Sequence, residues 1–360
     1  MFISKRKIGG KHYFYLEDRV NGKRISISLG RKEKVPGGIE SAFDELTRKT
    51  TLERLKISQK KFKTGALSIS EQLTIERLKV DYGLLRDFFP QSFESFKEDE
   101  FVRYAHGSAS VEGNSLTEKE AALVLGKGVA VAGKKIGEIR EIENMKLASD
   151  ISEKLGEVNE RGIKKIHSAI MNGFDEKNPG EYRRGPMFIT ASEVRPPPAD
   201  KIKKEMEALF GWLEKNKGKM HPVELASEFH ARFEQIHPFN DGNGRTGREI
   251  LNTMLKLNDY PRAIINLENR ESYIALLERV QISKEYGKFS KFIYLCLEKR
   301  AQEIGKIITE NKKAILENLS EKAESRRGKS TTSGSMKWLR MGIPLMTSAH
   351  SLMARGISRT

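Results

Sequence analysis

The twelve residues His237-Pro238-Phe239-Asn240-Asp241-Gly242-Asn243-Gly244-Arg245-Thr246-Gly247-Arg248 decide how the centre of this 360-residue chain folds. The sequence before them, Pro222 to Ile236, places apolar side chains at helical spacing, which predicts an amphipathic helix. That helix is expected to end at His237, because Pro238 cannot continue it. A second helical pattern starts just beyond Arg245. The stretch is therefore predicted to be a loop between two helices, with its Gly-Asn-Gly segment at a helix N-terminus.

The residue types in this loop suit a bound polyphosphate. Free backbone N–H groups and the positive end of the helix dipole favour an anion, and glycines let the backbone approach phosphate oxygens closely. Arg245 and Arg248 are three positions apart, so their planar guanidinium groups are expected on the same side of the first helical turn. Asp241 can hold Mg²⁺, which prefers oxygen ligands. His237 is the type of side chain that takes a proton from an attacking hydroxyl near neutral pH.

The stretch resembles the Fic family motif, HPFx(D/E)GNGRxxR, and matches it at every specified position. The resemblance implies a mainly α fold, a Fic-type helical bundle with a β-hairpin flap. It also implies transfer of AMP from ATP, with Mg²⁺, to a hydroxyl side chain of a protein substrate, this protein itself included. His237 would be the catalytic base, Asp241 the Mg²⁺ ligand and Phe239 a buried anchor. The implied nucleotide-binding residues are Gly242, Asn243 and Gly244 around the α- and β-phosphates, Arg245 on the phosphates, and Arg248 on the γ-phosphate.

A second motif lies upstream, at Ser108-Ala109-Ser110-Val111-Glu112-Gly113. It resembles the (S/T)xxxE(G/N) motif of autoinhibited Fic proteins, which implies an inhibitory helix over about residues 100–113, with Ser108 and Glu112 as its motif residues. A glutamate at a helix end can form a bidentate ion pair with an arginine. If Glu112 pairs with Arg248, that arginine cannot bind the γ-phosphate. The alternative is an ordinary exposed glutamate that closes a helix at Gly113.

The segment between these motifs resembles the flap of Fic proteins. Gly180-Glu181-Tyr182-Arg183 precedes Met187-Phe188-Ile189-Thr190. The resemblance implies that Met187, Phe188 and Ile189 hold the backbone of the target protein as an added strand beside the base. The alternative is a plain connecting hairpin.

The N-terminal part, residues 1–36, is predicted to be a small β-sheet. His12 to Leu16 and Arg24 to Leu29 alternate like strands, Asn21-Gly22 between them is a hairpin signal, and Met1 to Ile8 supplies a third strand. Such a sheet could contact DNA, dock on the core or form a homodimer. Gly30 to Gly38 is interpreted as a linker. Residues 37–97 form a helical linker region, with helices over residues 40–62 and 68–88.

The Fic catalytic domain is predicted over residues 98–300 and a C-terminal helix over residues 301–324, within one long helical pattern from about residue 291 to 322. Residues 325–360 resemble a basic tail or an incomplete winged-helix module, with a membrane-surface helix as a further alternative. The chain has one cysteine, Cys296, in an apolar run, and no apolar run long enough to span a membrane. A cytoplasmic protein without a membrane partner is therefore expected.

The net charge of +16 is concentrated at the two ends. Residues 1–34 hold ten Lys and Arg against three Asp and Glu, and residues 325–360 hold seven Lys and Arg without an acidic residue. Basic ends favour a nucleic-acid partner or another acidic partner, although charge for solubility explains them too. This charge allows an alternative function, a DNA-binding regulator whose Fic site senses nucleotide. The resemblance to Fic proteins implies another, a bifunctional enzyme in which the same glutamate, Glu112, supports removal of AMP.

Overall fold

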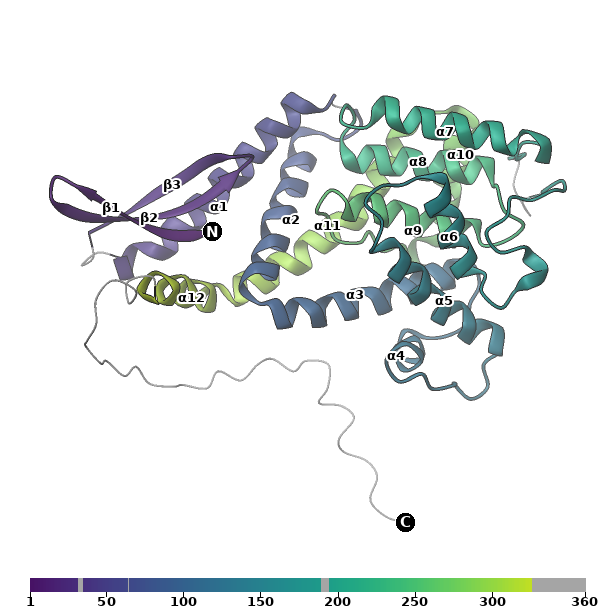
Figure 1. Cartoon of the computed structure of the whole chain (residues 1–360), viewed down its shortest axis with the longest axis horizontal. Helices are drawn as coiled ribbons and strands as arrows, with labels where there is room; N and C mark the ends of the chain where they lie inside the picture. Colours follow the sequence, from purple (N-terminus) through teal and green to yellow (C-terminus); the bar gives the residue numbers. More distant parts are fainter. Residues whose placement is uncertain (32–34, 64, 189–193, 326–360) are drawn as a thin grey trace, which may run out of the picture.

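The computed structural model describes residues 1–31, 35–63, 65–188 and 194–325. This part of the chain is mainly helical, with a three-stranded antiparallel sheet at one end of the molecule and a helical bundle at the other (Figure 1). The elements are β1 (Phe2–Ile8), β2 (Lys11–Val20), β3 (Lys23–Gly30), α1 (Val35–Lys61), α2 (Ile69–Phe88), α3 (Pro90–Val111), α4 (Glu118–Lys127), α5 (Ile136–Ser152), α6 (Glu160–Ile170), α7 (Ile202–Asn216), α8 (Pro222–Ile236), α9 (Asn243–Lys256), α10 (Arg270–Ser283), α11 (Gly287–Glu310) and α12 (Lys312–Ser325).

The N-terminal sheet has the order β1-β2-β3, as the sequence predicts. Asn21 and Gly22 join β2 to β3 with φ angles of 48° and 79°, values that suit a type I′ hairpin turn. Phe14 and Leu16 are buried in the same apolar cluster as Phe43 of α1, and both β2 and β3 contact that helix. The sheet is thereby fixed to the helical region behind it.

Local capping signals place several helix ends. Ser68 caps α2 and Thr117 caps α4, each in a capping box with the glutamate three residues later. Two sequence predictions need correction. The linker is shorter than Gly30 to Gly38, because α1 already begins at Val35 and a proline is tolerated in a first helical turn. The helix that carries the upstream motif begins at Pro90 rather than near residue 100, because that proline also fits a first turn.

The prediction of one long C-terminal helix is wrong. Helix α11 ends at Glu310 and α12 begins at Lys312. Between them, Nδ2 of Asn311 donates to the Ile307 carbonyl at 2.8 Å, a side-chain bond that competes with helix continuation. After the break, α12 turns to contact β1 and α1 and buries Ile315 and Leu319. The tail or winged-helix prediction falls on residues 326–360, outside the described residues.

The bundle is built around α8 and α9. Helix α8 has the predicted bounds and contacts α7, α10 and α11, whereas α9 contacts α3, α5 and α6. Phe229, Phe233, Leu251 and Leu255 are fully buried between them, and each such side chain contributes about 1.5–3 kcal/mol to stability. The loop between α8 and α9 therefore joins two helices whose facing side chains are fully buried. Nowhere in the described chain is a helix long and apolar enough to cross a membrane.

Candidate active site

The loop between α8 and α9 ends in a helix N-terminus with free donors. His237 closes α8 with a φ of 48°, and Gly242, with a φ of 70°, precedes α9. Helix α9 begins at Asn243, earlier than the sequence indicates. Within the described residues, the N–H groups of Asn243, Gly244 and Arg245 have no acceptor. Three N–H groups at the positive end of a helix form a site for an anion.

The side chain of Asn243 is used inside the loop. Its Oδ1 accepts from the Phe239 N–H and its Nδ2 donates to the Phe239 carbonyl, both at 2.9 Å. The amide therefore closes the loop upon itself, and Asn243 is only 2% exposed. What remains for a bound anion at this position is the backbone N–H.

His167 of α6 lies beneath the loop and contacts it. Its ring stacks on Phe239 with centroids 3.6 Å apart. The Gly180 N–H donates to Nδ1 at 2.8 Å, so the ring proton is on Nε2, which donates to the Asp241 carbonyl at 2.9 Å. Burial lowers the pKa of His167 to about 4. This neutral histidine from α6 fixes the backbone before the Gly-Asn-Gly segment.

A pH-dependent loss of stability follows from His167. Between pH 6.5 and about 4 the unfolded chain binds a proton at this ring and the folded chain does not, so stability falls as the pH falls. Above pH 6.5 both states are neutral and the contribution is complete. The loss is about 1.4 kcal/mol per pH unit. Urea unfolding of the wild type and of His167→Asn at several pH values measures it, and identical slopes in the two proteins would contradict it.

Arg183, from the Gly-x-Tyr-Arg segment, ties the flap region to the loop. Its N–H donates to the Pro238 carbonyl and its Nε to the His237 carbonyl, both at 2.9 Å, and the side chain is buried. In the predicted flap, Met187 is partly buried and Phe188 is 73% exposed, and neither belongs to a strand. Ile189 lies outside the described residues.

The ring of His237 is largely buried beside α8, with 21% of the side chain exposed. Burial lowers its pKa below the ordinary histidine value, with opposing contributions from the Glu234 backbone and the Glu112 charge. The imidazole is therefore neutral at pH 7, the form that accepts a proton. Its Nδ1 lies 3.8 Å from Oε2 of Glu234.

Asp241 presents a half-exposed carboxylate at the mouth of the loop. Its Oδ1 accepts from the Gly242 N–H at 2.6 Å, and Lys177 and Arg245 each approach the carboxylate to 3.6 Å. The described residues contain no group of three or more His, Cys, Asp or Glu side chains that could hold a metal ion alone. One accessible carboxylate does fit Mg²⁺, which commonly binds one carboxylate, several waters and the phosphates of a substrate.

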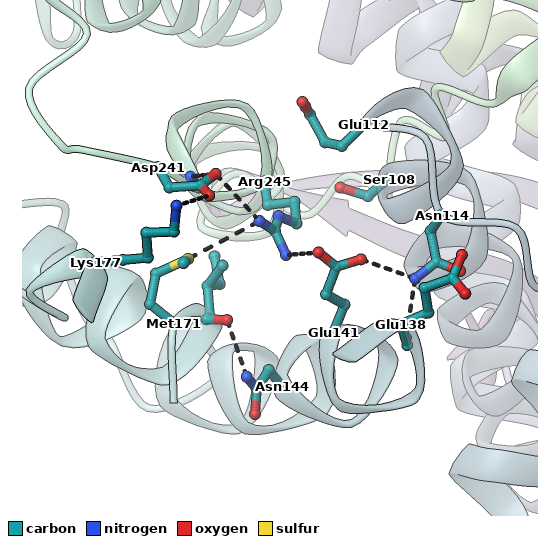
Figure 2. A network of polar contacts seen from close by, with 12 residues as sticks. Ser108, Glu112, Asn114, Glu138, Glu141, Asn144, Met171, Lys177, Asp241 and Arg245 are labelled. Carbon is teal, nitrogen blue, oxygen red and sulfur yellow. Dashed lines mark hydrogen bonds and ion pairs between the residues drawn. The ribbon is translucent and has the colours of Figure 1, made fainter. Parts of the chain in front are cut away.

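Arg245 extends toward α5 (Figure 2). Its Nη1 lies 3.0 Å from Oε1 of Glu141, whose Oε2 accepts from Nδ2 of Asn114 at 2.8 Å. The same Nδ2 reaches the Glu138 carbonyl, and the Asn114 N–H donates to the Ala109 carbonyl. A continuous set of polar contacts thus joins this arginine to the turn that follows α3.

Arg248 extends toward α3 instead, so the two arginines engage different helices. It is fully buried, and its Nε and Nη2 donate to Oγ and the carbonyl of Ser108 at 2.9 and 2.8 Å. Nη2 also contacts Oε1 of Glu112 at 2.8 Å. The ion pair is monodentate rather than bidentate: Nε donates to Ser108 and Nη1 donates to Tyr273 Oη at 3.4 Å.

The Glu112 carboxylate lies directly over the first turn of α9. A Cβ built on Gly244 would stand 2.2 Å from Glu112 Oε1 and 2.8 Å from Arg248 Nη1. Burial raises the pKa of Glu112, but the charge and hydrogen bond of Arg248 outweigh it, and the pKa falls below the ordinary glutamate value. An ionised carboxylate, 40% exposed, therefore sits beside the free N–H groups.

The sequence profile of the Fic/DOC family matches residues 157–255, from just before α6 to the end of α9. Residues 157–255 are a Fic/DOC family domain. The Fic domain thus contains His237, the N-terminus of α9, His167 and Arg183. The α3 segment with Ser108 and Glu112 lies outside the matched residues.

Two relatives give the Fic domain a wider context. Protein adenylyltransferase Fic of Drosophila persimilis is 32% identical over 209 residues, which cover 56% of this chain and 40% of the relative. The protein of the same name from Drosophila virilis is 32% identical over 209 residues and 42% of its length. The chain therefore spans about two fifths of the length of these curated relatives.

Solved structures confirm the mainly helical, Fic-like fold. A Fic domain containing signaling protein from Bacteroides thetaiotaomicron superposes with a TM-score of 0.60 at 22% identity, over 64% of this chain and 95% of that one. Fic-1 of C. elegans gives 0.56 at 21%, over 77% and 80%. A Fic family protein from Desulfovibrio desulfuricans gives 0.55 at 26%, over 69% and 78%.

Gly242 is the glycine on which the loop of the Fic domain most depends. Its φ is positive, and a Cβ there would stand 2.6 Å from the Met171 sulfur. Gly242→Ala is expected to lower the free energy of unfolding by about 2–5 kcal/mol, the sum of left-handed strain and overpacking. Gly218→Ala is the matched control, since Gly218 has a φ of 76° and no atom within 4 Å of the added Cβ. Denaturant unfolding of both variants measures the difference, and equal losses would exclude the contact with Met171.

Proposed function

We propose that this chain transfers AMP from ATP to a hydroxyl side chain of a protein, and that Glu112 restrains this activity. The observation that carries the proposal is the set of unpartnered N–H groups at the start of α9. The same loop begins with His237, which is neutral at pH 7. In space, the N–H groups lie beside the Arg248 guanidinium. An anion site, a base and a cation suit the positioning of a triphosphate for attack.

The chemistry follows from these groups. The N–H groups of Asn243, Gly244 and Arg245 bind phosphate oxygens, and Arg248 binds the terminal phosphate once Glu112 has released it. His237 takes the proton of the hydroxyl while the oxygen bonds to the α-phosphorus. The bond from that phosphorus to the β-phosphate bridging oxygen breaks, and pyrophosphate leaves. Asp241 would hold Mg²⁺, which would supply neutralisation of phosphate charge.

The proposed restraint has two parts. Glu112 takes up part of the Arg248 guanidinium, and its carboxylate stands in contact with the turn of α9 that the phosphates would approach. The negative charge of the Glu112 carboxylate repels a triphosphate at that point. The carboxylate also competes with the phosphates for the Arg248 guanidinium.

The target is a protein in this proposal. The relatives with 32% identity are named protein adenylyltransferases, and the flap residue Phe188 projects into solvent where a target segment could pack on it. Phe188 and Met187 are assigned to target docking, together with Ile189. A nucleic-acid partner or a homodimer through the N-terminal sheet remains a prediction from charge and hairpin pattern alone.

Transfer from ATP labelled in two positions tests the function. Label at the α-phosphate is expected to appear on protein in a lysate, or on this protein, and label at the γ-phosphate is not. Intact mass should rise by one AMP. Transfer of the γ-label would replace the proposal with phosphoryl transfer. Salt-dependent DNA binding without any label transfer would favour the DNA-binding regulator, and loss of AMP from a purified modified target would favour the bifunctional enzyme.

A further inference from the structure

A buried carboxyl group stands behind the base. Glu234 lies on α8, three residues before His237, and is 7% exposed. Its Oε2 is 3.8 Å from Nδ1 of His237, and its Oε1 is buried without a hydrogen-bond partner. We propose that Glu234 is the positioning residue of the base: it accepts from Nδ1–H of His237 and so keeps the lone pair of Nε2 directed at the hydroxyl of the target. This inference rests on the proposed function.

The placement of Glu234 is built into the helix pair. His230 and Glu234 are four residues apart on α8 and therefore share a face. That face meets Gly247 of α9, where a built Cβ would stand 2.4 Å from Glu234 Oε1 and 2.7 Å from His230 Nδ1. Because both distances are measured from the same Cβ position, Glu234 Oε1 and His230 Nδ1 are at most about 5 Å apart. A side chain larger than hydrogen at Gly247 would displace the carboxyl group.

The polar contacts continue from His230 to the ion pair of Glu112. His230 Nε2 lies 2.8 Å from Tyr273 Oη, and Tyr273 Oη accepts from Arg248 Nη1 at 3.4 Å. These groups are buried in the bundle, where a polar atom without a partner is rare and costly. Apolar side chains would fill this space at lower cost. A row of polar groups that begins at the base and ends at Arg248 therefore indicates a role in the reaction.

The protonation states agree with a positioning role. Burial raises the pKa of Glu234 to about 8, with Arg248 opposing the shift and Glu112 adding to it. Burial also lowers the pKa of His230 to about 3. At pH 7 both groups are neutral, and Glu234 has the proposed role of acceptor for Nδ1–H of His237, whose Nδ1 lies 3.8 Å from Oε2. A base whose far nitrogen is held in this way has a fixed tautomer.

The test uses the full chain carrying Glu112→Gly as the parent protein. Glu234→Gln and Glu234→Ala are each added to this parent and compared with it. Alanine is expected to lower kcat about 10- to 100-fold with an unchanged KM for ATP, the range seen when an orienting partner is removed. Glutamine is expected to rescue most of that loss, because its amide oxygen accepts from Nδ1. Above pH 8 the parent should gain rate as Glu234 ionises beside His237, and the glutamine variant should lack that step. Equal losses in both variants with unchanged pH profiles would overturn the proposal.

A second readout does not depend on transfer. Nitrogen-15 shifts of the His237 ring, assigned with His237→Asn, report which ring nitrogen carries the proton. Nδ1–H is expected in the parent and in Glu234→Gln, and a shift toward Nε2–H in Glu234→Ala. If the parent transfers no AMP but the tautomer changes as stated, the proposed function fails and the positioning stands. An unchanged tautomer in a folded Glu234→Ala protein would reject Glu234 as the positioning residue.

Discussion

Replacing Glu112 with glycine is expected to raise the rate of AMP transfer by about 5- to 150-fold, the range of typical coupling free energies between two sites. The Glu112 carboxylate holds Arg248 Nη2 at 2.8 Å and touches the first turn of α9. Glycine removes both the competing charge and the obstruction, and Arg248 keeps its two contacts to Ser108. The guanidinium then stays in place while one face becomes available to a phosphate.

Initial rates with α-labelled ATP and Mg²⁺ measure this effect, with isothermal titration of ATP alongside. Affinity for ATP is expected to rise in the same variant, because the carboxylate no longer repels the phosphates. Glu285→Gly is a matched control: it makes the same substitution at an exposed glutamate in the loop after α10, where Glu285 forms no ion pair within the described chain. A Glu112→Gly protein as slow as the wild type would remove the proposed restraint, even if transfer itself is detected.

Sequence patterns predicted those parts of the fold that depend on neighbouring residues. Helix α8 has the predicted bounds because apolar spacing and two flanking prolines act within a few residues. The Asn21-Gly22 turn and the Ser68 cap are local for the same reason. The residues around Asn311 are compatible with one continuous helix, so the pattern could not show the break, after which α12 contacts the sheet.

The supporting residues of the candidate site could not be predicted, because they come from distant parts of the chain. His167 stacks under Phe239 and Glu141 pairs with Arg245, but neither belongs to a motif that marks it. The spacing of Arg245 and Arg248 indicated one shared side, whereas α3 and α5 each take one arginine. Glu234 lies three residues before the motif, and only the close approach of Gly247 shows that it faces the interior.

Removal of the base is expected to have the larger effect in the active form. In a Glu112→Gly background, replacing His237 should lower kcat by about 10²- to 10⁴-fold, the usual contribution of general acid–base catalysis. His237 has a φ of 48°, and alanine at such a position is strained, whereas asparagine tolerates it. His237→Asn is therefore the better variant, because a loss of rate can then be separated from a loss of fold.

The same variant should still bind ATP. The phosphate-binding N–H groups belong to α9, and Arg183 holds the backbone carbonyls of residues 237 and 238 rather than the imidazole. Unchanged ATP affinity with lost transfer would place His237 in the proton-transfer step. Transfer within about threefold of the parent, well short of the loss expected for a general base, would mean that water or another group accepts the proton. In that case His237 would not be the general base of the transfer.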